Sequence, residues 1–336
     1  MAATLTIRKG TGDAMTTLCP YGFRIVGACT EARRTVNWSA AFGAYAACDD
    51  RAEVNREAYL SAFTFGTDFR EQLENFGTVK GYVGECFAPW LWIDIDRTEL
   101  SAALHDCRRL VTTIGERLGI AEAELLACFS GSKGFHIGIP TALWTPRPSA
   151  TFHRIARRFA ERIAEAAGVS IDTSVYDKVR AFRAPNSRHG KTGRHKRRLP
   201  VDELMYLSAD AIVRLAAAPE PFEIPSPFAH SEAAAALWLE ASELVQREAD
   251  AKAARQATGD SSATLNRLTL EFIRSGAAVG ERHPRIFSAA ANLAEFGCPP
   301  ALAYALLTEA GLDCGLSPSE VRRQIDCGLN HTGGAA

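Results

Sequence analysis

The spacing of apolar residues changes several times along the middle of the chain, and each change marks an expected element. Residues 89–96 form a bulky, β-prone run, which predicts a core strand. Apolar residues then recur at helical spacing over 101–118, behind a serine that can cap the helix and ahead of a glycine that can end it. A second helix is predicted over residues 149–167 by the same criteria.

Shorter apolar segments complete this region. Residues 125–129 and 135–139 flank a Ser/Gly-rich turn and predict a hairpin, and residues 169–175 predict a returning strand. Upstream, one helix is expected around residues 53–74, in a region without a functional motif. The order strand, helix, hairpin, helix, strand indicates an α+β fold with helices layered on one face of a sheet.

The composition changes after residue 207. Four prolines within residues 216–231 are typical of a stiff connector, and the Ala/Glu-rich segment 231–256 predicts a long helix. Short helices are expected beyond it. We therefore divide the chain into residues 1–214, a connector with a long helix over 215–262, and a small all-α domain over 263–332.

Bulk composition sets limits on the class of protein. The chain has 336 residues, of which 47% are hydrophobic, so it can bury a substantial core. No apolar run is long enough for a membrane span and no signal pattern opens the chain, so we expect a cytoplasmic protein without membrane partners. The nine cysteines include no CxxC pair, which favours reduced thiols; Cys19, Cys29 and Cys48 would be the first zinc ligands to test.

Asp94 and Asp96 end the predicted core strand. Side chains at i and i+2 of a strand share a face, so the two carboxylates stand side by side and repel each other unless a cation lies between them. Carboxylate oxygens suit Mg²⁺ or Mn²⁺, and a pair of such ions can activate a 3′-hydroxyl and stabilise a leaving pyrophosphate. A strand end that simply emerges into solvent is the alternative explanation.

The predicted turn between the two short strands could hold an anion. Gly131 and Gly134 allow backbone amides to approach a phosphate closely, and Lys133 adds a positive charge. His136 alternates with apolar neighbours and can donate to a phosphate or to the 3′ end of a nucleic acid.

A third acid follows downstream. Asp172 ends an apolar segment and is the preferred third metal ligand, whereas Asp177 is the competing candidate because it enters a basic loop. Between Arg183 and Arg198 the chain carries only basic charges inside a protein whose net charge is −1. The part of this basic tract expected to contact template or primer phosphates comprises Arg188, Arg194, Lys196, Arg197 and Arg198.

These elements, in this order, resemble the archaeo-eukaryotic primase superfamily. Asp94-Ile-Asp96, the Ser130–His136 turn and Ile171-Asp172 match its three motifs, and the turn is also similar to that of the polymerase domain of bacterial end-joining ligases. The resemblance covers roughly residues 55–205 and implies a sheet like that of an RNA-recognition motif, antiparallel and flanked by helices. It also implies two metal ions on Asp94, Asp96 and Asp172. The residues it assigns to the incoming nucleoside triphosphate are Ser130, Ser132, Lys133, Gly134, His136, Arg183 and, less directly, Lys191.

The C-terminal segment 279–330 is similar to the helical domain that follows many plasmid and phage primases. The resemblance as a whole implies a DNA primase or primase-polymerase that acts on single-stranded DNA. Two other hypotheses remain open: a gap-filling polymerase that only extends primers, and a nucleic-acid-binding replication module without catalysis. The chain contains no GxxxxGK[ST] motif, so any unwinding would come from a helicase partner.

Overall fold

The computed structural model describes residues 18–226, 229–257 and 265–331, and the chain forms two compact units, residues 1–250 and 251–336. Each unit has its own hydrophobic core. Within the described residues no helix is both long enough and apolar enough to cross a bilayer.

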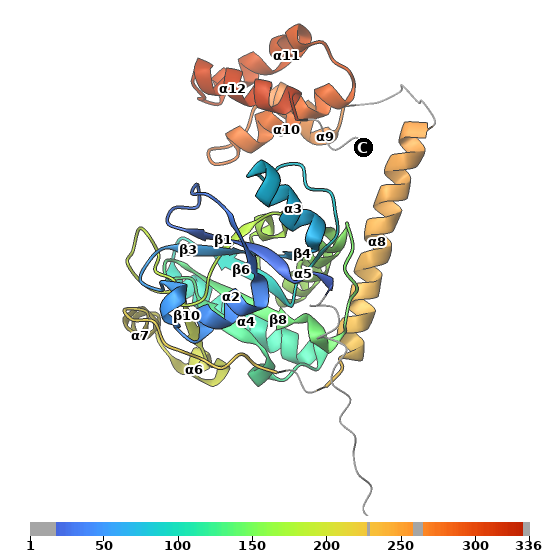
Figure 1. The fold of residues 1–336 in the computed structure, drawn as a ribbon. Helices are drawn as coiled ribbons and strands as arrows, with labels where there is room; N and C mark the ends of the chain where they lie inside the picture. Colours follow the sequence, from blue (N-terminus) through green and yellow to red (C-terminus); the bar gives the residue numbers. More distant parts are fainter. Residues whose placement is uncertain (1–17, 227–228, 258–264, 332–336) are drawn as a thin grey trace, which may run out of the picture. The chain divides into compact units, whose positions relative to one another are not determined.

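The first unit contains two antiparallel sheets (Figure 1). Sheet A has the order β5-β4-β1-β3-β9, and β2 also pairs with β1. Its strands are β1 (Tyr21–Val26), β2 (Arg34–Asn37), β3 (Ala58–Ser61), β4 (Thr64–Phe65), β5 (Cys86–Phe87) and β9 (Ala181–Arg183). Sheet B has the order β10-β7-β8-β6. Its strands are β6 (Trp90–Asp96), β7 (Leu126–Phe129), β8 (Gly134–Pro140) and β10 (Arg197–Leu199).

Helices cover both sheets. The helices of the first unit are α2 (Trp38–Ala46), α3 (Thr67–Phe76), α4 (Leu100–Leu118), α5 (Phe152–Ala167), α6 (Val201–Tyr206), α7 (Ala209–Leu215) and the first part of α8 (Glu232–Ala257). Short 3₁₀ helices are η1 (Asp50–Ala52), η2 (Glu122–Glu124), η3 (Thr141–Leu143) and η4 (Thr173–Tyr176). Helices α2 and α3 pack against β1 and β2, while α4 packs against β6, β8 and α5. Both α4 and α5 end at a glycine in the left-handed conformation.

Aromatic side chains join the two sheets. The ring of Phe182 on β9 lies 5.3 Å from that of Trp92 on β6 and 4.3 Å from that of His136 on β8, centroid to centroid. These contacts bring one end of sheet A against the strands of sheet B that carry the predicted acids and turn.

The α+β class is confirmed, as are the core strand, both central helices and the hairpin. Two predicted elements are wrong. Residues 53–74 contain strands β3 and β4 before helix α3, because β3 pairs with β1 and β9 while β4 pairs with β1 and β5. Residues 169–175 form no strand, since Asp172 accepts a hydrogen bond from the Ser174 amide and caps η4 instead.

The proline-rich connector leads into α8, whose first part belongs to the first unit. Trp238 packs against Phe152, Phe159 and Trp144, and Glu248 accepts a hydrogen bond from Arg158 at 2.6 Å. The long helix predicted over residues 231–256 is present, and it packs on the first unit as far as Glu248.

The regular elements of the second unit, among its described residues after α8, are all helices. Its helices are α9 (Arg267–Ser275), α10 (Arg282–Glu295), α11 (Pro300–Asp313) and α12 (Pro318–Leu329). Helices α10 and α12 make its most extensive contact, which requires Gly328, because a side chain there would collide with Ala290 and the Phe287 carbonyl. Ser317 and Glu320 form a capping box that starts α12.

Candidate active site

A cavity of about 230 Å³ lies where the two sheets meet. Sheet B contributes Asp94, Asp96, Ser130, Ser132, Lys133 and His136, and the other side contributes Tyr59, Val175, Arg180, Ala181, Phe182, Arg183 and His189. Six residues predicted on sheet B and one predicted on β9 are thus brought together around one space. A cavity lined by acids on one side and by cations on the other is suited to a ligand that carries phosphates and metal ions.

The paired acids occupy the end of β6 that faces this cavity. Asp94 lies opposite His136 and Asp96 opposite Gly134 in the antiparallel register between β6 and β8. Burial, followed by the charges of Asp96 and Asp172, raises the pKa of Asp94 to about 7. Its Oδ1 is buried and accepts no hydrogen bond from a described residue, which leaves a strong acceptor atom facing the cavity.

His136 lies beside Asp94 and is neutral. Its Nε2 is 3.5 Å from Asp94 Oδ1, and its ring packs on Phe182. Burial and the positive charges of Lys196 and Arg183 hold the pKa of His136 well below its usual value. The imidazole therefore offers an uncharged donor or acceptor to a ligand in the cavity.

The turn between β7 and β8 forms the floor of the cavity on the Asp96 side. Ser130 Oγ accepts hydrogen bonds from the amides of Ser132 at 3.4 Å and Gly134 at 3.2 Å, which fixes the turn and leaves the hydroxyl hydrogen for a ligand. A side chain at Gly134 would collide with Asp96 Oδ1 and the Ile95 carbonyl, so glycine permits this close approach. Lys133 Nζ lies 3.7 Å from Asp96 Oδ2.

Asp172 lies next to the acids but outside the lining of the cavity. Its amide donates to the Asp94 carbonyl at 2.9 Å, and its charge is one of those that raise the pKa of Asp94. Both of its carboxylate oxygens accept hydrogen bonds from Ser174, at 2.8 and 2.9 Å. Asp172 is thus linked to the pair both through its amide and through its charge.

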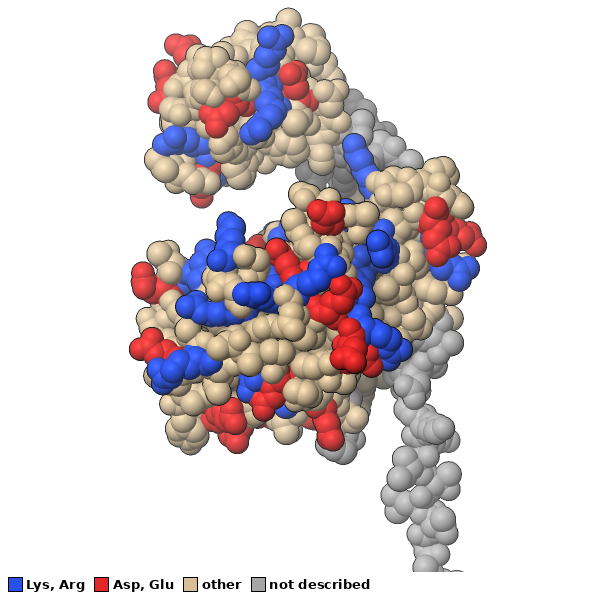
Figure 2. Space-filling model, turned by 60° about the vertical axis from the view of Figure 1, so that its left-hand side comes forward, with Lys and Arg blue, Asp and Glu red and all other residues tan. Residues whose placement is uncertain are grey.

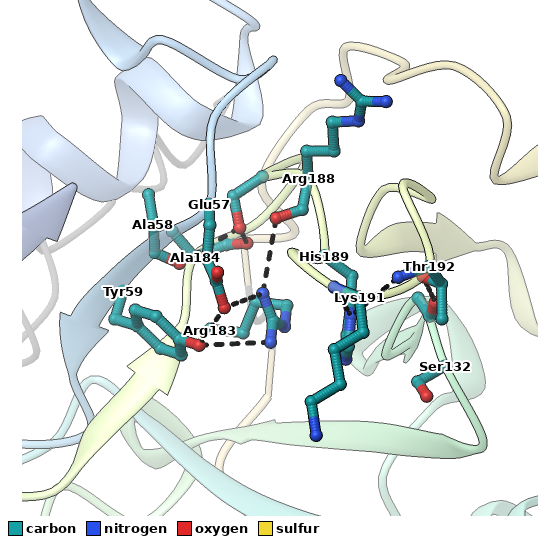
Figure 3. Close-up of polar contacts among 12 residues, drawn as sticks. Glu57, Ala58, Tyr59, Ser132, Arg183, Ala184, Arg188, His189, Lys191 and Thr192 are labelled. Atoms are coloured by element: carbon teal, nitrogen blue, oxygen red, sulfur yellow. Dashed lines mark hydrogen bonds and ion pairs between the residues drawn. The ribbon is translucent and has the colours of Figure 1, made fainter. Parts of the chain in front are cut away.

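The wall opposite the acids includes residues that the sequence did not single out. Tyr59 comes from β3, Arg180 precedes β9, and His189 lies in the loop after Arg183. In Figure 3, Tyr59 and Arg183 lie side by side, and His189 and Lys191 extend from the same loop. The exposed Lys191 does not line the cavity. Glu57 and Tyr59 alternate with the apolar Ala58 and Leu60, which is the pattern of a strand, but this segment falls inside the helix expected over residues 53–74.

The basic tract divides into exposed and internal residues. Arg188 is exposed and Arg194 partly so, on the loop before β10, and Figure 2 shows Lys and Arg side chains gathered on a face of the first unit. Lys196 is a correction to the prediction, because its side chain is buried. Its ammonium donates to the Arg183 carbonyl at 3.0 Å and lies over the rings of Trp92 and Phe182. Burial lowers the pKa of Lys196 to about 8.

Arg197 and Arg198 belong to β10 and are also partly enclosed. Arg197 forms an ion pair with Glu220, and the Arg198 guanidinium lies 5.6 Å over the ring of Phe222. Both side chains therefore hold the proline-rich connector against the end of sheet B. Of the predicted phosphate contacts, Arg188 and Arg194 are the two best placed to meet a nucleic acid.

The donor set at the acidic side fits a hard divalent cation. It consists of carboxylate oxygens, one of them buried and without a hydrogen-bond donor. No group of three His, Cys, Asp or Glu side chains among the described residues is arranged to hold an ion by itself. Mg²⁺ is commonly held by one or two carboxylates together with substrate phosphates, and Asp94 with Asp96 would match that arrangement. All nine cysteines are unpaired thiols.

Comparisons with known proteins add one structural likeness. No protein-family model matches the sequence, and no curated protein matches it. The crystal structure of primase RepB' is similar to this chain with a TM-score of 0.36 and 15% sequence identity, covering 96% of this chain and 94% of that one. A TM-score this low does not by itself establish a shared fold, so the assignment of function rests on the residues of the cavity.

Proposed function

We propose that the chain is a template-directed nucleotidyl transferase of the primase type, which makes or extends primers on single-stranded DNA. One observation carries this proposal: a single cavity holds two adjacent carboxylates, a glycine-rich turn with a lysine, and an arginine from the other sheet. A nucleoside triphosphate needs these three features together, since it presents a polyphosphate and the metal ions that accompany it.

Asp94 and Asp96 would hold divalent metal ions, with Asp172 as the outer member of the set. When bound, such ions activate the attacking 3′-hydroxyl and stabilise the leaving pyrophosphate. The carboxylates lie on adjacent outward positions of one rigid strand, so their spacing is fixed by the backbone.

The remaining residues of the cavity would bind and orient the nucleotide. Lys133 and Arg183 face the space from opposite sides and can neutralise a triphosphate, while Ser130 and Ser132 offer hydroxyl donors. Neutral His136 can donate one hydrogen bond to a phosphate without adding charge. Holding the α-phosphate in line with a primer hydroxyl accounts for a large part of the barrier reduction in such a reaction.

The test is a synthesis assay with labelled nucleotides. Purified protein, single-stranded DNA, and Mg²⁺ or Mn²⁺ should yield oligomers, with ribo- and deoxyribonucleotides supplied separately and with or without a primer. The double variant Asp94→Ala/Asp96→Ala should yield none. Asp202→Ala is the matched control, because Asp202 is an exposed acid on α6 and does not line the cavity.

Unchanged product from the double variant would sink the assignment. Product that forms only when a primer is supplied would replace primer synthesis by primer extension. If the wild-type protein makes no product and titration calorimetry detects no Mn²⁺-dependent nucleotide binding, the chain is a binding module instead.

A further inference from the structure

Glu57, just before β3, joins Tyr59 and Arg183 in a compact polar cluster at the rim of the cavity (Figure 3). The Tyr59 hydroxyl donates to Glu57 Oε1, and Arg183 Nη1 lies 3.6 Å from the same oxygen. Arg183 Nη2 donates to the Tyr59 hydroxyl at 3.3 Å, and the guanidinium lies 5.0 Å from the centre of the Tyr59 ring. The guanidinium is therefore held at two of its nitrogens and against an aromatic face.

The same carboxylate supports the loop formed by residues 188–195. Its Oε2 occupies the space that a side chain at Gly190 would need. The Arg188 amide donates to the carbonyls of Val54 and Arg56, both at 3.0 Å, and the Arg188 carbonyl accepts from Arg183 Nη1 at 3.4 Å. The segment that carries Glu57 is thus the base on which this loop lies.

The loop reaches the opposite wall as well. Thr192 Oγ1 donates to the Gly131 carbonyl at 2.5 Å, which ties the loop to the turn of sheet B. His189 Nδ1 accepts from the amides of Lys191 at 3.2 Å and Thr192 at 3.4 Å, so the proton of the neutral ring lies on Nε2. The loop consequently bridges the two walls of the cavity, with its sheet A end fixed at Glu57.

We propose that Glu57 is a positioning residue, which orients Arg183 and fixes the 188–195 loop so that the cavity can bind the triphosphate of a nucleotide. This inference rests on the proposed function. The hydrogen bonds to Tyr59 and Arg188 use two of the five guanidinium donors, and the ion pair with Glu57 holds the group in place, so other donors remain for phosphate oxygens. A planar guanidinium recognises phosphate only in the correct orientation, so fixing that orientation in advance reduces the entropy lost on binding.

The experiment measures binding of ATP and of inorganic tripolyphosphate, each with Mg²⁺, by titration calorimetry. Glu57→Gln should weaken both about tenfold, the lower end of what a change in a residue that orients a ligand group costs. Tyr59→Phe, which removes one link of the same cluster, should weaken both about threefold. Glu53→Gln is the matched control, since Glu53 lies on the same segment and pairs with Arg24 and Arg56 instead of Arg183.

A second variant perturbs the cluster while Glu57 is retained. Gly190→Ala keeps a backbone conformation that alanine adopts but places its methyl group where the Glu57 carboxylate lies. It should weaken tripolyphosphate binding by a similar factor. The Glu57→Gln/Gly190→Ala double variant should lose little more than either single variant, because both remove the same contact.

Kinetics separate positioning from general damage to the fold. Glu57→Gln should raise the KM for the nucleotide about tenfold with kcat changed by less than about threefold, and Glu57→Asp should recover part of the loss. Unchanged or tighter tripolyphosphate binding by a folded Glu57→Gln protein overturns the inference; if that variant does not fold, unchanged binding by Tyr59→Phe does so. A wild-type protein that binds neither probe overturns the proposed function instead.

Discussion

The two walls of the cavity are built in different ways. The acidic wall (Asp94, Asp96 and the turn 130–134) comes from neighbouring antiparallel strands whose register places each residue. The basic wall (Glu57, Tyr59, Arg183 and the loop 188–195) joins segments such as Tyr59 and Arg183, which are 124 residues apart. Strand pairing places residues of both walls, since Tyr59 and Arg183 are register partners in β3 and β9. The second wall additionally depends on side-chain contacts of Glu57 and Arg183 and on the loop 188–195. Substitutions at the acidic wall should therefore slow the chemical step, and substitutions at the basic wall should weaken ligand binding.

The largest expected effect is at the acidic wall. Asp94→Asn and Asp96→Asn keep the side-chain shape but remove the charge, so each should reduce nucleotide incorporation by on the order of 10³-fold. The same variants should raise the melting temperature of the ligand-free protein, because two adjacent carboxylates repel each other when no cation lies between them. Gel assays of primer synthesis and thermal melting measure the two effects.

Asp172→Asn and Asp177→Asn form a matched pair for the third acid. Asp172 is hydrogen-bonded to the Asp94 carbonyl through its amide, and Asp177 makes no such contact. We expect the Asp172 variant to lose activity and the Asp177 variant to keep it. Equal activities in the two variants would restrict the acidic wall to Asp94 and Asp96.

The next largest effect is a change of stability with pH, expected where helix α5 packs against strand β5 of sheet A. His153 on α5 has Nδ1 3.9 Å from Cys86 Sγ on β5, and its ring lies 6.5 Å from that of Phe63. Burial, then the charges of Lys178 and Arg154, lowers the pKa of His153 from 6.5 to about 4. The unfolded chain therefore binds a proton at higher pH than the folded chain does.

Stability linked to His153 is complete above about pH 6.5 and is lost as the pH falls toward 4. A difference of this size corresponds to about 3 kcal/mol between the two limits. Urea unfolding of the wild type and of His153→Gln from pH 7 to pH 4 measures it. If the free energy of unfolding falls by the same amount in both proteins as the pH is lowered, groups other than His153 cause the loss of stability.

Much of the acidic wall could be predicted from the sequence. Of the basic wall, Arg183 and basic residues of the loop 188–195 could be predicted, whereas Glu57 and Tyr59 could not. The run 89–96 and the hairpin around Ser130 carry their own periodicity and turn residues, so local pattern and final structure agree. Tyr59 lies in a segment expected to be helical. The segment forms a strand instead, and that strand is stabilised by pairing with β1 and β9, which are distant in the sequence. Pairing between distant strands leaves no local pattern to read.

Lys196 shows the same limit of prediction from local sequence within the basic tract. Its neighbours are charged, so sequence places it on the surface, yet the rings of Trp92 and Phe182 and the Arg183 carbonyl enclose its ammonium. The residues that enclose it come from two strands of different sheets. Burial of a lysine in such a pocket depends on the assembled fold and not on adjacent residues.

The basic tract contains both exposed and buried cations, and we expect effects of intermediate size when they are substituted. Arg188→Ala and Arg194→Ala should each weaken binding of single-stranded DNA and reduce the slope of log K against log salt by about 1, because each removes a phosphate contact. Lys196→Met should leave that slope unchanged, since the buried ammonium reaches no phosphate. Fluorescence anisotropy at several salt concentrations measures the slopes. A smaller slope in a folded Lys196→Met protein would place Lys196 in the nucleic-acid interface.

The smallest expected effect is at the hydrogen bond between Thr192 of the basic loop and Gly131 of the acidic wall. Thr192→Val removes the hydroxyl that donates to the Gly131 carbonyl but keeps the shape of the side chain. A net loss of about 1 kcal/mol would raise the KM for the nucleotide about fivefold. The kcat should stay near the wild-type value, because the acids and their strand register are untouched. Thr192→Ser keeps the donor and should behave as the wild type. If Thr192→Val lowers kcat instead of raising KM, the loop takes part in the chemical step and the two walls do not divide the work as their construction indicates.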